Sequence, residues 1–208
     1  MGRNILLKIG IIGNGVHSKR IQKILKKKKY KFLIYKPNSK NYFDKEKYKE
    51  LKKQNVIFIV TPNKSHFKYL KDKKKNRYIF CEKPPVSTKK EIEKLKRYNL
   101  KKIYFNYNFR YSALSQFLME SKKYNLGQLI NGKIIIGHGL AFKKEYVKNW
   151  RSSKKKCPKG VFETVSIHWV DLINYIFGIK KQNSKLLNLS GNGDSFDTSY
   201  TDIFCNSG

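Results

Sequence analysis

The sequence is poor in cysteine, in acidic residues and in long apolar runs. Its three cysteines, Cys81, Cys157 and Cys205, stand far apart, form no Cys-x-x-Cys pair and join no histidine cluster at the spacing of a zinc site. This pattern is typical of structural thiols in a reducing cytoplasm. No apolar run is long enough to span a bilayer, and the N-terminal residues lack the small-residue cleavage site of a signal peptide. We therefore expect a cytoplasmic protein without a membrane partner and without a metal site.

Acidic residues are scarce beside the basic ones. The 208 residues include 14 Asp and Glu against 47 Lys and Arg, a formal net charge of +33. Such an excess is typical of proteins that bind nucleic acid, and that interpretation stays open as an alternative. However, the lysines are spread along the whole chain, no RNA-binding aromatic motif or recognition helix accompanies them, and the composition is that of an adenine- and thymine-rich coding sequence. We therefore expect no nucleic-acid partner, although the positive field favours acidic small molecules.

Apolar residues make up 39% of the sequence, enough for a globular core. Short apolar runs typical of buried strands alternate with segments of helical periodicity through the first half of the chain. The predicted strands are residues 6–13, 31–35, 56–60, 78–82 and 101–108. The predicted helices are residues 16–28, 42–54 and 89–99, and residues 61–75 predict a turn followed by a helix. Ser87 or Thr88, with Glu91, supplies a capping box for the last helix. This alternation predicts an α/β fold with a doubly wound parallel sheet over residues 1–111.

The pattern changes after Tyr111. Residues 112–127 predict a helix closed by Gly127, and residues 128–142 predict a longer strand. A lysine-rich loop leads to an apolar helix over residues 162–178, which Gly178 ends. The remaining residues predict strand pieces joined by turns.

The turn after the first strand carries the chemistry of a dinucleotide site. In "GNGVHS", Gly13 permits the tight bend and Gly15 lets a pyrophosphate approach the backbone, while Ser18 replaces the third glycine, which governs packing. Amides at the start of the following helix hold the anion. Because two glycines alone are a weak signal, a purely structural turn remains the alternative.

The second strand lacks the acidic residue that binds the ribose hydroxyls of NAD. Tyr35 and Lys36 stand there instead, followed by Ser39 and Lys40. A lysine or serine at this place suits the 2′-phosphate of NADP, so the sequence predicts NAD or NADP with a slight preference for NADP. Alternatively, Lys36 is one more surface lysine.

Three further stretches follow strands three, four and five: "TPNKSH", "CEKPP" and "NYNFRYS". Carboxyl ends of parallel strands are where α/β sheets bind ligands. Together with "SIHWVD", these stretches resemble the Gfo/Idh/MocA oxidoreductases, in order and over essentially the whole chain. The resemblance implies a Rossmann domain followed by an α+β domain with an open mixed sheet. It also implies hydride transfer between NAD or NADP and a secondary alcohol or ketone of a sugar, sugar nucleotide or cyclitol, with surface-polysaccharide synthesis as one setting.

The resemblance also assigns residues. Lys83 and His168 correspond to the family's catalytic pair at the substrate, and Glu82 pairs with Lys83 to fix its direction. The cofactor residues it implies are Gly13, Asn14, Gly15, Val16, His17, Lys36, Thr61, Pro62, Asn63, His66, Glu82 and Lys83. The substrate residues it implies are Lys83, Arg110, Thr164, His168 and Asp171. A histidine suits proton removal near neutral pH, and a cationic lysine stabilises negative charge on the substrate oxygen.

The sequence departs from the family in two ways. Thr164 stands where the family often carries an aspartate one helical turn before the histidine, with Glu163 beside it. Residues 112–208 are also short for the family's substrate and oligomerisation domain, so we expect a truncated or split-gene product in which the family's usual homo-oligomer is in doubt. A cofactor-binding but catalytically inactive protein is therefore the main alternative.

Overall fold

The computed structural model describes residues 7–37, 45–71, 77–125, 127, 130–136 and 139–206. The chain forms two compact units, residues 1–106 and 107–208. The division therefore falls after Asn106, whereas the sequence interpretation placed it after Tyr111. Within the described ranges, no helix combines the length and hydropathy needed to cross a bilayer.

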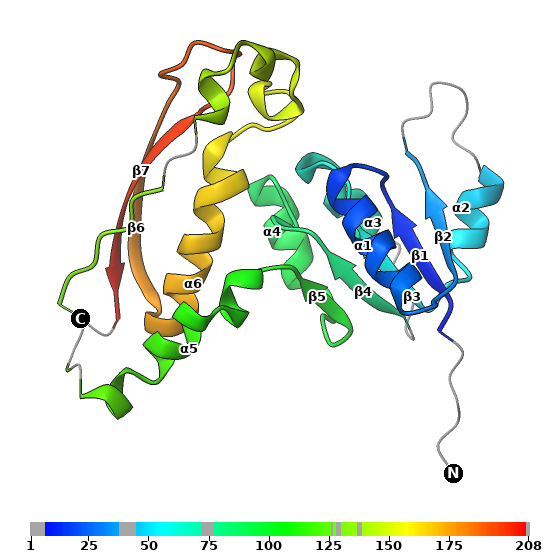
Figure 1. The fold of residues 1–208 in the computed structure, drawn as a ribbon, viewed down its shortest axis with the longest axis horizontal. Helices are drawn as coiled ribbons and strands as arrows, with labels where there is room; N and C mark the ends of the chain where they lie inside the picture. The colour runs from blue at the N-terminus through cyan, green and yellow to red at the C-terminus, as the bar shows by residue number, and fades with distance from the viewer. Residues whose placement is uncertain are drawn as a thin grey trace. The chain divides into compact units, whose positions relative to one another are not determined.

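The first unit is a five-stranded parallel sheet with the strand order β2-β1-β3-β4-β5 (Figure 1). Its strands are β1 (Ile9–Ile12), β2 (Phe32–Tyr35), β3 (Val56–Ile59), β4 (Tyr78–Cys81) and β5 (Ile103–Phe105). Its helices are α1 (Val16–Lys27), α2 (Lys45–Leu51), α3 (His66–Leu70) and α4 (Lys89–Lys96). The predicted doubly wound sheet is therefore confirmed, although most elements are shorter than predicted.

The helices lie on both faces of this sheet. On one face, Leu51 of α2, Leu70 of α3 and Leu95 of α4 join the largest hydrophobic core. On the other face, Leu25 of α1 packs with Ile9 and Ile11 of β1 in a smaller core. Because side chains alternate along each strand, both faces of β1 are buried, as a central parallel strand requires.

The predicted capping box at α4 is confirmed, and Thr88 is its N-cap. Thr88 Oγ1 accepts a hydrogen bond from the Glu91 amide at 3.2 Å, and the Glu91 carboxylate accepts from the amides of Ser87 and Thr88. These bonds satisfy amides at the helix start that have no partner within the helix.

The second unit combines helices with an antiparallel strand pair. Its main elements are α5 (Ala113–Met119), the π-helical turn η7 (Phe162–Ser166), α6 (Ile167–Phe177), β6 (Ile179–Leu187) and β7 (Thr198–Cys205). Short 3-10 turns cover residues 108–111, 121–124, 140–142, 144–148 and 150–152. β6 and β7 pair antiparallel from Leu187↔Thr198 to Ile179↔Cys205. The resemblance implied an open mixed sheet in this unit, and the described residues form two antiparallel strands of it, β6 and β7.

The prediction of a strand over residues 128–142 is wrong for the described part of that segment. Residues 130–136 form no strand and are exposed, and Leu140–Phe142 forms a 3-10 turn. A strand exists through hydrogen bonds to a neighbouring strand, and no described strand pairs with these residues. The apolar run favoured extended backbone, but a strand also needs a neighbouring strand to bond with, and the run alone does not predict one.

Candidate functional site

The turn between β1 and α1 is built around Gly13. Its φ is +112°, and a Cβ added there would lie 2.2 Å from the backbone oxygen of Val60. Its amide donates a 2.9 Å hydrogen bond to the carbonyl of Tyr35. A side chain at this position is therefore excluded by both conformation and space. The close approach packs the turn against the end of β3.

Gly15 has the opposite surroundings. A Cβ added at Gly15 would meet no atom within 4 Å, and its φ of −74° suits any residue. Gly15 is the N-cap of α1, and neither a capping side chain nor an acidic residue in the first turn meets the helix amides. The helix start is therefore an open, electropositive backbone surface of the kind that binds phosphate.

Ser18 holds the turn together from inside. Its side chain is fully buried, and its Oγ donates a 2.8 Å hydrogen bond to the carbonyl of Gly13. Gln22, one helical turn later, donates to Ser18 Oγ at 3.0 Å and to Asn14 Oδ1 at 3.2 Å. Sequence reasoning accepted Ser18 for its small size but missed this network. The spacing of Ser18 and Gln22 on one helix face was the available signal.

The segment after β3 places Thr61, Pro62 and Asn63 at the same edge of the sheet as the glycine turn. Ser65 Oγ donates to Thr61 Oγ1 at 2.8 Å, and Pro62 is exposed. Asn63 is buried, and within the described part of the chain its Nδ2 has no hydrogen-bond partner. A buried amide group without a partner is costly unless something else accepts its hydrogen bond.

His66 joins two loops from a fully buried position. Its Nδ1 lies 2.7 Å from the carbonyl oxygen of Pro84, and its Nε2 lies 2.6 Å from that of Thr61. Burial lowers the pKa of His66, although the two carbonyls oppose this shift. Because the ring is enclosed and both nitrogens face the backbone, we assign His66 to positioning these loops rather than to contact with a cofactor.

Glu82 follows β4 and links it to two other elements. His17 Nε2, from the first turn of α1, lies 2.8 Å from Glu82 Oε1, and Asn106 Nδ2 donates to the same oxygen at 2.6 Å. The neighbouring Lys83–Pro84 peptide bond is cis, and Lys83 is half-buried. Sequence reasoning missed Asn106, although its place after the last strand of the sheet was a usable signal.

The other predicted cofactor residues lie on the surface. Val16, in the first turn of α1, and Lys36, directly after β2, are both exposed. The preceding Tyr35 is buried and packs against Tyr48 with the two rings tilted by 48° and their centroids 5.2 Å apart. Ser39 and Lys40, which contributed to the NADP prediction, fall outside the described residues.

In the second unit, Arg110 and Asp171 pair with each other. Arg110 Nε and a terminal nitrogen donate to the two carboxylate oxygens of Asp171 at 2.7 and 2.5 Å. This hydrogen bonding raises the pKa of the Arg110 guanidinium, which also lies 4.8 Å from the ring centroid of Tyr175. The two predicted substrate residues thus form a partly buried, bidentate ion pair.

The residues before His168 form a π-helical turn. Thr164 Oγ1 donates to the carbonyl of Gly160 at 3.0 Å. Glu163 is buried, and its carboxylate accepts from the amide of Lys159 at 3.0 Å. Thr164 supplies a hydroxyl where the Gfo/Idh/MocA oxidoreductases often carry an aspartate, and Glu163 is engaged as a structural acceptor. His168 stacks on Phe109, with ring centroids 4.7 Å apart.

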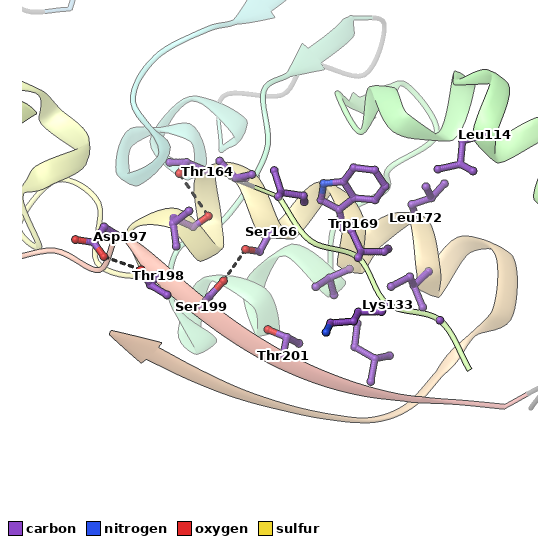
Figure 2. A pocket seen from close by; sticks show the side chains of 18 of the residues that line it. Leu114, Lys133, Thr164, Ser166, Trp169, Leu172, Asp197, Thr198, Ser199 and Thr201 are labelled. Carbon is purple, nitrogen blue, oxygen red and sulfur yellow. Dashed lines mark hydrogen bonds between the residues drawn. The ribbon is translucent and has the colours of Figure 1, made fainter. Parts of the chain in front are cut away.

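A cavity of about 1170 Å³ lies in the second unit (Figure 2). Trp169 and Leu172 of α6, Leu114 of α5 and Thr201 of β7 are among its lining residues, and apolar side chains predominate. Of the predicted substrate residues, Thr164 lines it. A 2.7 Å hydrogen bond between Ser166 and Ser199 joins the π-helical turn to β7 at its edge (Figure 2).

Comparison with known proteins identifies the fold. No family model matches the sequence, and no curated protein matches it. Solved structures do match, among them GenD2 from gentamicin A biosynthesis in complex with NAD, with a TM-score of 0.70 and 14% identity over 96% of this chain and 62% of that chain. This chain therefore spans less than two thirds of the length of that protein.

Two dehydrogenases named WlbA are also similar. That of Bordetella pertussis, in complex with NADH and UDP-GlcNAcA, has a TM-score of 0.69 and 15% identity over 96% of this chain and 66% of that chain. That of Thermus thermophilus, in complex with NAD and UDP-GlcNAcA, has a TM-score of 0.63 and 19% identity over 89% of this chain and 71% of that chain. The fold predicted from the resemblance to the Gfo/Idh/MocA oxidoreductases is confirmed.

Proposed function

We propose that this chain binds a nicotinamide adenine dinucleotide and belongs to an oxidoreductase acting on a sugar-like small molecule. The observation that carries the proposal is the turn between β1 and α1. At Gly13 a side chain would collide with the backbone oxygen of Val60. Gly15, in contrast, faces open space at a helix start without a capping side chain. A turn that served packing alone would have no need of glycine at the open position.

The surroundings of this turn fit a dinucleotide. The pyrophosphate would lie on the amides at the start of α1, where no acidic side chain of the first turn opposes it. Asn63 offers a buried Nδ2 to an acceptor on the cofactor. The chain's excess of Lys and Arg over Asp and Glu favours an anionic ligand. NAD or NADH is supported as the cofactor because the matched structures described above are complexes with NAD or NADH.

The nicotinamide ring supplies the hydride chemistry, and the chain supplies orientation and charge. Lys83 follows β4 at the carboxyl edge of the sheet and would hydrogen-bond the substrate oxygen, stabilising negative charge that develops there. Glu82, held by His17 and Asn106, would fix the direction of this loop. In the second unit, His168 would take the proton of the substrate hydroxyl, and its ring is oriented by Phe109.

The substrate class is proposed from the ligands of the matched structures. Both WlbA structures described above are complexes with UDP-GlcNAcA, so nucleotide sugars are the first compounds to try. Lys83, Arg110, Thr164, His168 and Asp171 remain the proposed substrate residues. Arg110 and Asp171 already bind each other, so they would offer a substrate their remaining donors and acceptors as a pair.

A second candidate function is cofactor binding without turnover. The observation that favours it is the region before His168, where Thr164 donates to Gly160 and Glu163 accepts from Lys159. Neither residue then provides a carboxylate for proton transfer next to the histidine. Binding of dinucleotide with no oxidation or reduction of any nucleotide sugar would favour this candidate.

Fluorescence titration of the full chain with NADH and NADPH tests the proposal. Saturable NADH binding that Gly15→Asp weakens by about tenfold or more is expected, because a carboxylate at the helix start repels phosphate. Absence of binding to either dinucleotide would overturn the proposal. The role of Lys36 is tested in the same assay, since Lys36→Asp shifts preference towards NADH if Lys36 faces the 2′-position.

Turnover is measured separately. Reduction of NAD with a panel of nucleotide sugars that includes UDP-GlcNAcA, followed at the nicotinamide absorbance, is expected for the wild-type chain. Lys83→Ala should abolish that turnover while NADH still binds, because Lys83 would act on the substrate oxygen. Loss of turnover together with loss of NADH affinity would instead make Lys83 a cofactor residue.

A further inference from the structure

The two faces of the sheet in the first unit are unequally covered. Helices α2, α3 and α4 contribute to the core on one face. On the other face, α1 is the one described helix of this unit, and its core reaches β1, β2 and β3. Strands β4 and β5 extend beyond it (Figure 1).

Burial falls steadily across this second face. In one row of paired residues, Ile11 of β1 has no exposed surface, whereas Phe80 of β4 is 38% exposed and Tyr104 of β5 is 47% exposed. In the next row, Ile9 and Val56 are buried, whereas Tyr78 of β4 is 43% exposed. The cover therefore ends at β3.

The residues left open are aromatic. We call the exposed Tyr78, Phe80 and Tyr104, together with the half-buried Phe58 that packs against the smaller core beside them, the aromatic face. Phe58 and Phe80 stack with ring centroids 5.1 Å apart, and Phe80 and Tyr104 stack at the same distance. On β4 they alternate with Ile79 and Cys81, which are buried on the opposite side. Parallel strands are normally covered on both faces, so an exposed aromatic row on β4 indicates a surface that another element covers.

Helix α1 forms a wall beside this face. His17, Ile24 and Lys28 follow one another at i, i+7 and i+11, which places them on one side of the helix. His17 reaches Glu82, directly after β4, so this side of α1 is turned towards β4. Ile24 is 61% exposed and adds an apolar side chain to the border of the aromatic face. The open strip beside α1 thus has the place that a second helix takes on a doubly wound sheet.

The charge of the first unit defines what kind of helix would fit. Residues 1–106 contain 32 Lys and Arg against 7 Asp and Glu, whereas residues 107–208 contain 15 against 7. Lys28 lies at the α1 border, and Lys102 Nζ lies 5.2 Å from the ring centroid of Tyr78. An anionic partner is therefore complementary to this surface, and a second copy of the same unit is repelled.

The ring geometry favours a polypeptide over a nucleic acid. Single-stranded nucleic acids stack their bases on open ring faces. Phe80 already stacks with Phe58 on one side and with Tyr104 on the other, at interplanar angles of 18° and 17°. These rings offer outward edges, which suit packing against aliphatic side chains.

We propose that the aromatic face is the docking site of an amphipathic, acidic α-helix of a partner polypeptide. The helix lies beside α1, packs its apolar stripe on Phe80 and Tyr104, and directs Asp or Glu side chains to Lys28 and Lys102. This mode places an apolar helix face on a preformed apolar surface. The site is separate from the glycine turn and does not depend on the proposed oxidoreductase function.

The test uses the full chain and a fluorescein-labelled synthetic helix. The peptide has about 18 residues, since shorter isolated helices are marginal, with Leu along one face and Glu on both flanks. A control peptide carries Lys in place of each Glu. Fluorescence anisotropy should show binding of the Glu peptide at least about tenfold tighter than binding of the Lys peptide, weakening as salt rises.

Substitutions locate the site. Phe80→Ser with Tyr104→Ser should reduce affinity by about tenfold or more, while Tyr200→Ser, an exposed tyrosine of the second unit, should leave it unchanged. Lys28→Glu with Lys102→Glu should shift the preference towards the Lys peptide, and these two positions lie outside the hydrophobic core, so this variant is informative if the aromatic one unfolds. NADH affinity should be unchanged in the lysine variant.

Three outcomes would overturn the proposal. The first is no binding of the Glu peptide by the wild-type chain. The second is binding that neither the aromatic nor the lysine substitutions alter. The third is binding of a thymidine oligonucleotide in place of the peptide, lost on Phe80→Ser with Tyr104→Ser, which would make the face a nucleic-acid surface.

Discussion

The buried hydroxyl of Ser18 donates a 2.8 Å hydrogen bond to the carbonyl oxygen of Gly13. Ser18 stands where a third glycine is expected, and the bond closes the turn from the helix side. Gln22 extends the contact to Asn14 on the outer part of the turn. Where a third glycine would allow close backbone packing, Ser18 instead closes the turn through a side-chain hydrogen bond.

Ser18→Ala should weaken the hydrogen bonding that holds this turn. Loss of the buried hydrogen bond leaves the Gly13 carbonyl with one fewer donor, so we expect the free energy of unfolding to fall by about 1–2 kcal/mol and NADH affinity to weaken. Chemical denaturation and fluorescence titration measure the two effects. Ser184→Ala, at an exposed position of β6, is the control and should change neither. Unchanged stability in Ser18→Ala would show that the bond is not needed to hold the turn.

Alanine at Gly13 and at Gly15 should have different effects. Gly13→Ala forces a Cβ against Val60 at a φ of +112°, so it should destabilise the unit by more than about 1 kcal/mol. Gly15→Ala meets open space, so its stability should change by less than about 1 kcal/mol while NADH binding weakens. Thermal melting measures the stability of both variants, and fluorescence titration measures their affinity for NADH. Equal binding by wild type and Gly15→Ala would contradict a phosphate at this position.

Asn63→Ala should separate stability from binding in another way. In the described structure Asn63 Nδ2 is buried without a partner, so removing it relieves a desolvation cost that the folded chain carries. We expect stability without ligand to be unchanged or higher, and NADH affinity to fall by about tenfold. Stability measured with and without NADH checks this. A loss of stability without ligand, with affinity intact, would assign Asn63 a purely structural role.

His66 should make the fold sensitive to acid. Burial lowers its pKa below the ordinary 6.5, so the unfolded chain binds a proton more readily than the folded one. The free energy of unfolding should therefore fall as pH drops below about 6.5, towards the lowered pKa. Denaturation across this range, with the His66 imidazole followed by NMR, measures the effect. A His66 midpoint above 6.5 would show that the carbonyls of Thr61 and Pro84 outweigh burial.

The sequence predicted the first unit better than the second because its signals are local. Strand β3 is a continuous apolar run, and α4 carries its own capping box, so neighbouring residues were enough to define both. Ile134–Ile136 is also an apolar run, yet residues 130–136 form no strand, because pairing depends on a partner far along the chain. The same limit applies to site residues such as His66, whose burial is set by the contacts of Thr61 and Pro84.

By itself the sequence determined the alternation of strands and helices, the glycine turn and the residues that follow each parallel strand. These depend on periodicity and on the conformational freedom of glycine, which are properties of short segments. The tertiary structure alone decided that Ser18 closes the turn, that His66 is enclosed, that Arg110 binds Asp171 and that the aromatic face lies open. Each of these depends on which distant segments pack together and on where that packing stops, and no short segment carries that information.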